Sequence, residues 1–319
     1  MNDISVFGAG AFGTALAISL AKDGRNVSLI ARSDVHADQM NATRANNTRL
    51  KDFQFPDTLT ATADPTGPAP ICLMTVPTQT LAGLIEQHTE HLKGRTIVAC
   101  CKGVDLNSGL GPTGVIQQYC PTAKPAILSG PSFAVDIAAG LPTALTLAAK
   151  DETLAQQLQT DLSTANLRLY RTTDVIGVEL GGALKNVIAI GAGVTIGAGL
   201  GESARAALIT RGFAEMKRFA KDFGANPDTL SGLSGLGDLV LTCTSDKSRN
   251  YRHGLSLGSE KPPKTDTTEG ISTALVVADI ATTRNIDMPI TSTISALLAN
   301  RLTISQAITA LLSRPLKEE

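Results

Sequence analysis

Three glycines near the start of the chain, Gly8, Gly10 and Gly13, have the spacing of a phosphate-binding turn. They follow an apolar run, Ile4–Phe7, that predicts a buried strand, and they open a helical pattern. Gly8 permits a tight turn, Gly10 lets the backbone approach a pyrophosphate, and Gly13 allows the helix to pack closely on the sheet. The spacing alone is weak evidence, but the strand-to-helix context is the one that the mechanism requires. The turn predicts a dinucleotide site, with an incidental glycine-rich turn as the alternative.

The residue after the second predicted strand, Val27–Ala31, bears on which dinucleotide binds. An NAD site usually has an acidic residue there, about 20 residues past the glycines, that accepts a hydrogen bond from the ribose. This chain has Arg32, whose guanidinium would pair with the 2′-phosphate of NADPH. We therefore expect NADPH as the preferred cofactor and NADH as the alternative. In the other interpretation Arg32 is a solvated loop residue, and Asp34 caps the next helix or binds the ribose.

Lys185 lies in a long helical pattern of the second half, Val175–Ile196. The stretch from Gly177 to Gly201 contains eight glycines, although each glycine weakens a helix by about 1 kcal/mol relative to alanine. Close backbone packing against another element, or against a ligand, accounts for that pattern. Burial among small apolar residues would favour the neutral amine of Lys185, which then suits a general acid or base. A lysine whose ammonium reaches solvent at the helix edge is the equal alternative.

Polar residues after a second glycine-rich turn could bind a phosphate. The turn presents Asp238 at the head of an apolar segment. Further along, Ser248, Arg249 and Asn250 place a hydroxyl, a guanidinium and an amide side by side, which suits an anionic ligand. The alternative is that Asp238 is a helix N-cap and that the later residues form a charged surface turn.

Two loops of the first half end predicted strands and face the same way. Lys102 follows the predicted strand Thr96–Cys100, and Gly130 and Ser132 follow Ala126–Leu128. In doubly wound sheets, ligands bind outside the carboxyl ends of the strands. We therefore expect Lys102 to contact substrate, whereas a solvent-facing loop lysine is the commoner case.

Short apolar runs alternate with helical patterns up to Thr173, which predicts a parallel sheet with right-handed crossovers. Beyond that residue the pattern is helical. The further predicted strands are Ile71–Val76, Ala144–Ala148 and Leu167–Tyr170, and the further predicted helices are Thr14–Lys22, Val35–Asn46, Thr80–His91, Thr153–Leu162, Ala204–Phe223, Ser272–Thr283, Thr291–Ala299 and Ile304–Leu312, the last with a capping-box pattern. We predict an α/β Rossmann-type doubly wound sheet domain over residues 1–173, followed by an all-α domain over residues 174–319.

Composition excludes several classes of function. Lys and Arg number 28 and Asp and Glu 29, a net charge of −1, and the chain has no Trp, so no nucleic-acid surface is expected. The apolar run Val187–Leu200 is glycine-rich and shorter than the roughly 20 residues of a membrane span, so no stable membrane insertion is expected. Five scattered cysteines without a C-x-x-C pair predict neither a disulfide framework nor a metal site. With no signal peptide expected, the sequence predicts a cytoplasmic protein.

Several runs of the sequence together resemble the bacterial NAD(P)-dependent glycerol-3-phosphate dehydrogenases, and they span nearly the whole chain. The matching runs are Gly8–Ala17, Cys101–Gly103, Ser129–Ala134, Gly181–Asn186, Ala204–Gly212, Gly235–Leu239, Ser248–Asn250 and Glu269–Gly270. The resemblance implies reversible reduction of dihydroxyacetone phosphate to sn-glycerol 3-phosphate in glycerophospholipid biosynthesis, with Lys185 as proton donor and acceptor. One departure is Phe12, where the family usually has Trp, and it keeps an apolar ring beside the turn.

The resemblance, together with the glycine turn, implies contacts for two ligands. The residues implied for substrate are Lys102, Gly130, Ser132, Lys185, Asp238, Ser248, Arg249 and Asn250. The residues implied for the cofactor are Gly8, Gly10, Ala11, Phe12, Gly13, Arg32, Lys102, Ala134, Arg249 and Glu269. Two alternatives stay open: a β-hydroxyacid dehydrogenase or ketopantoate-type reductase with a carboxylate substrate, and a non-catalytic redox sensor that binds NADPH. The apolar helices of the second half also make a homodimer plausible.

Overall fold

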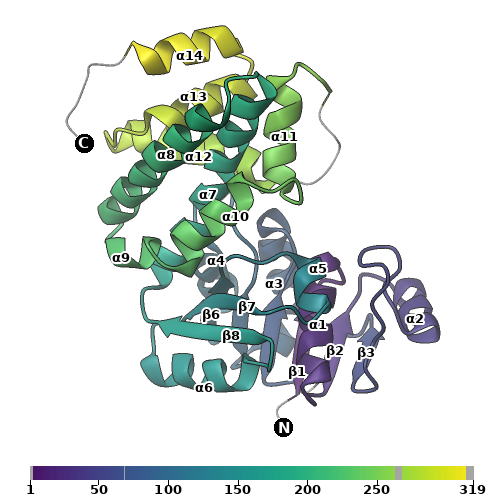
Figure 1. Cartoon of the computed structure of the whole chain (residues 1–319). Helices are drawn as coiled ribbons and strands as arrows, with labels where there is room; N and C mark the ends of the chain where they lie inside the picture. The colour runs from purple at the N-terminus through teal and green to yellow at the C-terminus, as the bar shows by residue number, and fades with distance from the viewer. Residues whose placement is uncertain (1–2, 68, 263–267, 314–319) are drawn as a thin grey trace. The chain divides into compact units, whose positions relative to one another are not determined.

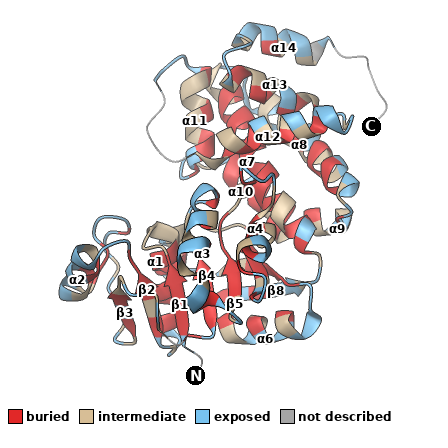
Figure 2. Ribbon diagram, turned by 180° about the vertical axis from the view of Figure 1, so that it is seen from behind, coloured by how far each residue is buried: buried red, intermediate tan, exposed pale blue. Residues whose placement is uncertain are grey.

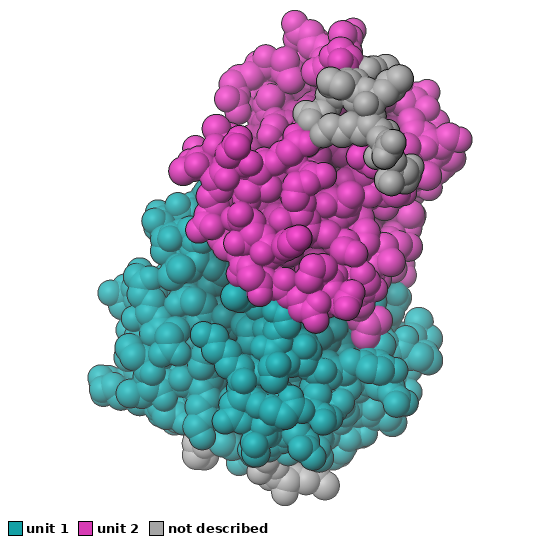
Figure 3. Space-filling view, turned by 90° about the vertical axis from the view of Figure 1, so that its left-hand side faces the viewer, with its two compact units in different colours: residues 1–179 teal, residues 180–319 magenta. Residues whose placement is uncertain are grey.

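The computed structural model describes residues 3–67, 69–262 and 268–313 (Figure 1). The chain divides into two compact units, residues 1–179 and 180–319, which Figure 3 shows in two colours. The division falls inside helix α7 (Val175–Gly197), a few residues beyond the expected boundary after Thr173. The reason is that Val175 and Val178, in the first turn of α7, pack into a core of the first unit.

The first unit is built on one eight-stranded sheet with the order β3-β2-β1-β4-β5-β6-β7-β8. The strands are β1 (Ile4–Phe7), β2 (Val27–Ile30), β3 (Leu59–Thr62), β4 (Ile71–Met74), β5 (Thr96–Ala99), β6 (Lys124–Ser129), β7 (Thr143–Ala148) and β8 (Leu167–Thr172). Neighbours run parallel except β6 and β7, which pair antiparallel. The predicted Rossmann-type sheet is therefore confirmed, whereas β3 and the reversal at β7 were not expected. The Leu-Thr-Ala-Thr sequence of β3 is too short and too polar for a strand to be predicted from it.

Successive residues of the central strands pack on opposite faces of the sheet, as strand geometry requires. Val6 shares one core with the helices α1 (Ala11–Lys22), α2 (Asp34–Thr43), α5 (Ala134–Ala138) and α6 (Glu152–Leu162). Its neighbour Phe7 shares the other core with α3 (Thr78–Leu92) and α4 (Pro112–Tyr119). Figure 2 shows the strands as buried between these two helical layers. This burial on both faces explains why the strands are almost continuously apolar.

The parallel strands end at a common edge of the sheet. Phe7 pairs with Ile30 on one side and with Met74 on the other, and Met74 pairs with Ala99. Because the strands are parallel and in register, the loops that follow them begin side by side. The predicted site residues in these loops are Gly8, Arg32, Lys102 and Gly130.

The second unit is helical throughout the part that the structure describes. After α7 come α8 (Glu202–Asp222), α9 (Pro227–Leu230), a π-helical turn η1 (Leu233–Gly237), α10 (Asp238–Cys243), α11 (Arg249–Gly258), α12 (Glu269–Thr283), α13 (Pro289–Leu298) and α14 (Ile304–Leu312). The predicted capping box is present, since Thr303 and Gln306 exchange hydrogen bonds at the start of α14. The sequence did not predict α9 to α11, because all three are short and α11 is also interrupted by Gly and Ser. By length and composition α7 could cross a membrane, but 89% of its most apolar window is buried inside the structure, as in a core helix.

Helices α7 and α11 cross with their backbones in contact. A methyl group at Gly193 would lie 2.1 Å from a carbonyl oxygen of α11, and one at Gly254 would lie 2.0 Å from a carbonyl oxygen of α7. Gly197 and Gly258, each four residues further on, repeat the same relation. Residues four apart lie on one face of a helix, so each helix presents a glycine stripe to the other. Close packing against another element, one of the two explanations for the glycines of α7, is therefore confirmed.

We expect Gly193→Ala to lower the free energy of unfolding by about 3 kcal/mol, because the added methyl group must push the two helices apart. The matched control is Gly83→Ala in α3, where nothing lies within 4 Å of the new methyl group. That substitution should be neutral or stabilise by up to about 1 kcal/mol through helix propensity. Urea denaturation of both variants measures the difference, and equal effects would contradict the backbone contact.

Candidate active site

The glycine turn between β1 and α1 has the shape that an anion requires. Gly8 has a φ of +111°, in the region that favours glycine. A methyl group at Gly13 would lie 2.2 Å from the carbonyl oxygen of Gly8, so only glycine fits. Gly10 is the N-cap residue of α1, has no side chain to cap the first turn, and has no atom within 4 Å of the place of a Cβ. The first-turn N–H groups and this open space fit the pyrophosphate of a dinucleotide.

Thr75, the residue after β4, fixes the turn from the neighbouring strand. Its hydroxyl donates to the carbonyl oxygens of Phe7 and Gly8, each at 2.9 Å. A methyl group at Gly13 would also lie 2.3 Å from Thr75 Oγ1, so Thr75 is a second reason why only glycine fits at this position. Thr75 was not predicted from the sequence, because only the pairing of β1 with β4 brings it to the turn.

Arg32 and its neighbours lie where β2 leads into α2. The side chain of Arg32 is exposed, so its guanidinium is accessible to an anion. The N-cap of α2 is Ser33, whose hydroxyl accepts the backbone N–H of His36 at 3.4 Å. The interpretation of Asp34 as the cap is therefore wrong, and this residue is the first of the helix instead.

Lys102, Gly130 and Ser132 converge on one carbonyl oxygen in the first unit. Lys102 Nζ donates to the oxygen of Gly130 at 3.1 Å, and Ser132 Oγ donates to the same oxygen at 3.3 Å. The backbone of Lys102 is held in turn, since its carbonyl accepts from Thr78 Oγ1 at 3.1 Å. Lys102 is half-buried and anchored rather than extended into solvent. Three residues from two separate loops thus form one polar group.

Lys185 is buried and bonded to two side chains. Its Nζ lies 3.0 Å from Asp238 Oδ1 and 2.6 Å from Thr242 Oγ1, and Thr242 donates to the same carboxylate at 3.2 Å. Lys185 is 6% exposed and Asp238 1% exposed, so the solvent-edge alternative for the lysine is wrong, and so is the N-cap alternative for Asp238. Burial disfavours the charged amine, but the adjacent carboxylate favours it. The site therefore holds a desolvated amine next to its counterion.

The close approach of η1 to α7 brings this ion pair together. A methyl group at Gly181 would lie 2.7 Å from the carbonyl oxygen of Ser234 in η1. Lys185 follows Gly181 by one turn of α7, and Asp238 follows η1 directly, so the two side chains meet. Thr242 was not predicted as a site residue, although it is one turn beyond Asp238 and therefore on the same face of α10.

The start of α11 is formed by Ser248, Arg249 and Asn250. These residues are not three equivalent hydrogen-bond donors for a ligand, because two of them are buried and bonded within the protein. Ser248 is the N-cap residue, and its hydroxyl accepts a backbone N–H of the first turn at 3.2 Å. Asn250 is buried, donates to Asn186 Oδ1 at 2.9 Å, and accepts the backbone N–H of Gly270 at 2.9 Å. Arg249 is the exposed member of the three. The first turn of α11 thus offers a cation on a rigid, internally bonded base.

The remaining predicted cofactor contacts are divided between the two units. Glu269 opens α12, and a methyl group at the next residue, Gly270, would lie 2.7 Å from Asn250 Oδ1. In the first unit, Ala11 and Phe12 begin α1, and Ala134 begins the neighbouring helix α5. All three are partly buried against the same core.

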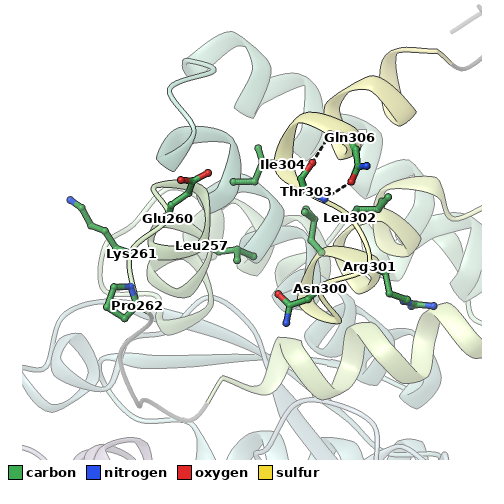
Figure 4. Close-up of a pocket in the computed structure, with 11 residues that line it drawn as sticks. Leu257, Glu260, Lys261, Pro262, Asn300, Arg301, Leu302, Thr303, Ile304 and Gln306 are labelled. Atoms are coloured by element: carbon green, nitrogen blue, oxygen red, sulfur yellow. Dashed lines mark hydrogen bonds between the residues drawn. The ribbon is translucent and has the colours of Figure 1, made fainter.

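Other parts of the molecule offer less for this chemistry. A hollow of about 560 Å³ lies at the far end of α11 from Arg249, with Leu257, Leu302 and Ile304 around it (Figure 4). Among the described residues no group of three or more His, Cys, Asp or Glu could hold a metal ion. The five cysteines are buried and lie outside any disulfide. Burial raises the pKa of Cys243, close to Lys185, to about 12, so this thiol is not an activated nucleophile.

Comparisons with known proteins identify the family. Models of the N-terminus and C-terminus of NAD-dependent glycerol-3-phosphate dehydrogenase match residues 3–155 and 174–309. The chain belongs to this family. The glycerol-3-phosphate dehydrogenase (NAD(P)+) of Cereibacter sphaeroides is 56% identical over 99% of this chain and 100% of its own length. The crystal structure of glycerol-3-phosphate dehydrogenase from Coxiella burnetii has a TM-score of 0.92 and 37% identity, and covers 98% of this chain and 99% of its own.

Membership of the glycerol-3-phosphate dehydrogenases confirms the resemblance seen in the motifs and makes the chain an NAD(P)-dependent oxidoreductase. The ketopantoate reductase of Ralstonia eutropha, from the alternative class, has a TM-score of 0.60 and 15% identity, and covers 97% of this chain and 99% of its own. That likeness shows the fold alone. The family therefore favours an enzyme over a non-catalytic sensor, and a phosphorylated substrate over a carboxylate.

Proposed function

We propose that this chain reversibly reduces dihydroxyacetone phosphate to sn-glycerol 3-phosphate with NADPH. The observation that carries the proposal is the buried Lys185 amine, held by Asp238 and Thr242. Reduction of a ketone places negative charge on its oxygen, which must then receive a proton. A desolvated lysine with its counterion beside it can give that proton and, in the reverse direction, accept it.

The steps at the protein follow from these contacts. When bound, the nicotinamide supplies a hydride to the carbonyl carbon. Lys185 Nζ transfers its proton to the carbonyl oxygen, which completes the alcohol. Asp238 and Thr242 fix the amine in one position, so little reorganisation is needed when the charge develops. The carboxylate also favours re-protonation of the amine before the next turnover.

We assign the phosphate of the substrate to the first turn of α11. Arg249 is exposed there, and a helix N-terminus and a guanidinium both favour an anion. Ser248 and Asn250 position this turn through their internal hydrogen bonds and have further donor groups for the ligand. From the first unit, Lys102, Gly130 and Ser132 are the substrate contacts in the proposal. A dianionic phosphate then explains selectivity over unphosphorylated dihydroxyacetone.

We assign the cofactor to the glycine turn and to Arg32. The turn has the open space and the uncapped helix start that a pyrophosphate needs, and the exposed Arg32 suits a 2′-phosphate. The assigned contacts are Gly8, Gly10, Ala11, Phe12, Gly13, Arg32, Lys102, Ala134, Arg249 and Glu269. The proposal includes a cytoplasmic location, which five buried cysteines outside any disulfide support. It also includes the biosynthetic role in glycerophospholipid synthesis that the family resemblance implies. A homodimer stays a prediction that sedimentation analysis tests.

The purified protein should oxidise NADPH when dihydroxyacetone phosphate is added, because the site combines an amine for the carbonyl oxygen with a cation for the phosphate. Absorbance of NADPH measures the rate. Unphosphorylated dihydroxyacetone and ketopantoate are the control substrates, and both should react far more slowly. Faster turnover of ketopantoate would indicate a ketopantoate-type reductase instead. No turnover with any of these substrates would favour a non-catalytic redox sensor.

Replacing Lys185 by Ala or by Met should lower kcat by about 10²–10⁴, the usual range for a general acid–base group, while NADPH still binds. Removal of one partner leaves the Asp238 carboxylate buried without its counterion, which weakens folding. The double variant Lys185→Met with Asp238→Asn removes both charges and separates the two effects. Lys221→Ala on α8 is the control for an exposed helical lysine. Near-normal kcat in a folded Lys185 variant would remove it from the proton-transfer role.

Arg32→Ala should weaken NADPH binding more than NADH binding, because only NADPH carries the 2′-phosphate that the guanidinium would pair with. We expect the affinity for NADPH to fall about 10-fold or more, as for a lost charge-assisted hydrogen bond. Titration of each cofactor, followed by its fluorescence, gives the two dissociation constants. If both change by the same factor, Arg32 does not contact the 2′-phosphate.

A further inference from the structure

Asn46 is a buried amide beneath the glycine turn, in the segment between α2 and β3. It is 1% exposed, and its Nδ2 donates to the carbonyl oxygen of Ala9 at 3.0 Å and to Thr14 Oγ1 at 2.8 Å. Ala9 lies inside the turn, and Thr14 is the first residue beyond it. One side-chain amide therefore holds the turn at both ends.

The contact with Ala9 restrains the peptide that matters most for an anion. A trans peptide is planar, so the N–H of Gly10 points opposite to the carbonyl of Ala9. Holding that carbonyl against Asn46 therefore fixes the direction of the Gly10 N–H. Glycine is otherwise free to rotate, and the turn contains glycine on both sides of Ala9. The other end is also fixed, since the N–H of Thr14 donates to the oxygen of Gly10 at 2.9 Å.

A hydrogen bond from Thr48 determines which way the Asn46 side-chain amide faces, since Thr48 Oγ1 donates to Asn46 Oδ1 at 3.0 Å. The main chain of Asn46 is held separately, because its backbone carbonyl oxygen accepts the N–H of Leu50 at 2.8 Å. The oxygen of the side chain thus faces a hydroxyl donor and the nitrogen faces the turn. An aspartate of the same shape would place an oxygen against the Ala9 carbonyl, where two acceptors repel each other.

We propose that Asn46 is a positioning residue for the cofactor: its amide holds the Ala9–Gly10 peptide in the orientation that binds the dinucleotide pyrophosphate. The inference rests on the proposed binding of NADPH at the glycine turn. It assigns to Asn46 the affinity for the dinucleotide and not the proton transfer at Lys185. A change at Asn46 should therefore alter the binding of NADPH and of NADH alike, since both carry the pyrophosphate.

The test compares Asn46→Asp with a matched control, Asn41→Asp. Asn41 also bonds backbone through both ends of its amide, because Nδ2 donates to Ala61 O at 2.8 Å and Oδ1 accepts from Ala61 N at 2.9 Å. These bonds hold the edge strand β3 and not the turn. For Asn46→Asp we expect the dissociation constants of NADPH and NADH to rise about 10- to 100-fold, as for a hydrogen bond replaced by repulsion. At saturating NADPH, kcat and the KM for dihydroxyacetone phosphate should stay within about twofold.

Asn41→Asp should lower the melting temperature but leave both dissociation constants unchanged. Thr48→Val provides a milder variant at an exposed residue, which removes the donor to Asn46 Oδ1 without disturbing the core. It should raise the same two constants about two- to fivefold, and it keeps the test open if Asn46→Asp does not fold. Unchanged constants in both Asn46→Asp and Thr48→Val, or equal rises in Asn41→Asp, would overturn the inference while the wild type still binds NADPH. A wild type that binds no NADPH would overturn the proposed function itself.

Discussion

The buried ion pair between Lys185 and Asp238 is the interaction that the packing of α7, η1 and α10 must accommodate. Two opposite charges are stable in a protein interior only if they are close and well bonded, because burial removes the water that would otherwise solvate them. The structure meets this condition with a direct contact of 3.0 Å and with Thr242 bonded to both partners. The contact in turn requires η1 to reach the backbone of α7, which the glycine at position 181 permits. The Lys185 amine is thus held by main-chain packing as much as by charge.

The sequence predicted those features that depend on local pattern. The first strand, the glycine turn and the start of α1 are recognisable because strand, turn and helix follow one another within a few residues. The glycines of α7 likewise indicated close backbone packing, and the crossing with α11 is the packing in question. Lys185 stood out because it is a charged residue among small apolar residues of a long helix. Family motifs then supplied the roles that residue types alone left open.

What the sequence could not predict depends on contacts between distant segments. Thr75 reaches the glycine turn only because β4 pairs with β1, and Asn46 reaches it from the segment after α2. Thr242 belongs to a helix too short to have a period of its own. The partners of Asn250 were equally hidden, since Asn186 and Gly270 are far from it in sequence. In each case a common residue type acquires a role from its neighbours in space.

The glycine contact between α7 and α11 sets the distance between these two helices in the second unit. Lys185 lies on one helix and Arg249 on the other, and the two helices touch through main-chain atoms at glycines. A larger residue at any of these glycines would push the helices apart, so the distance between the amine and the guanidinium depends on keeping glycine at the crossing. In the proposed substrate site, a longer phosphorylated ketone would therefore require a new packing of α7 against α11, and a wider pocket alone would not be enough.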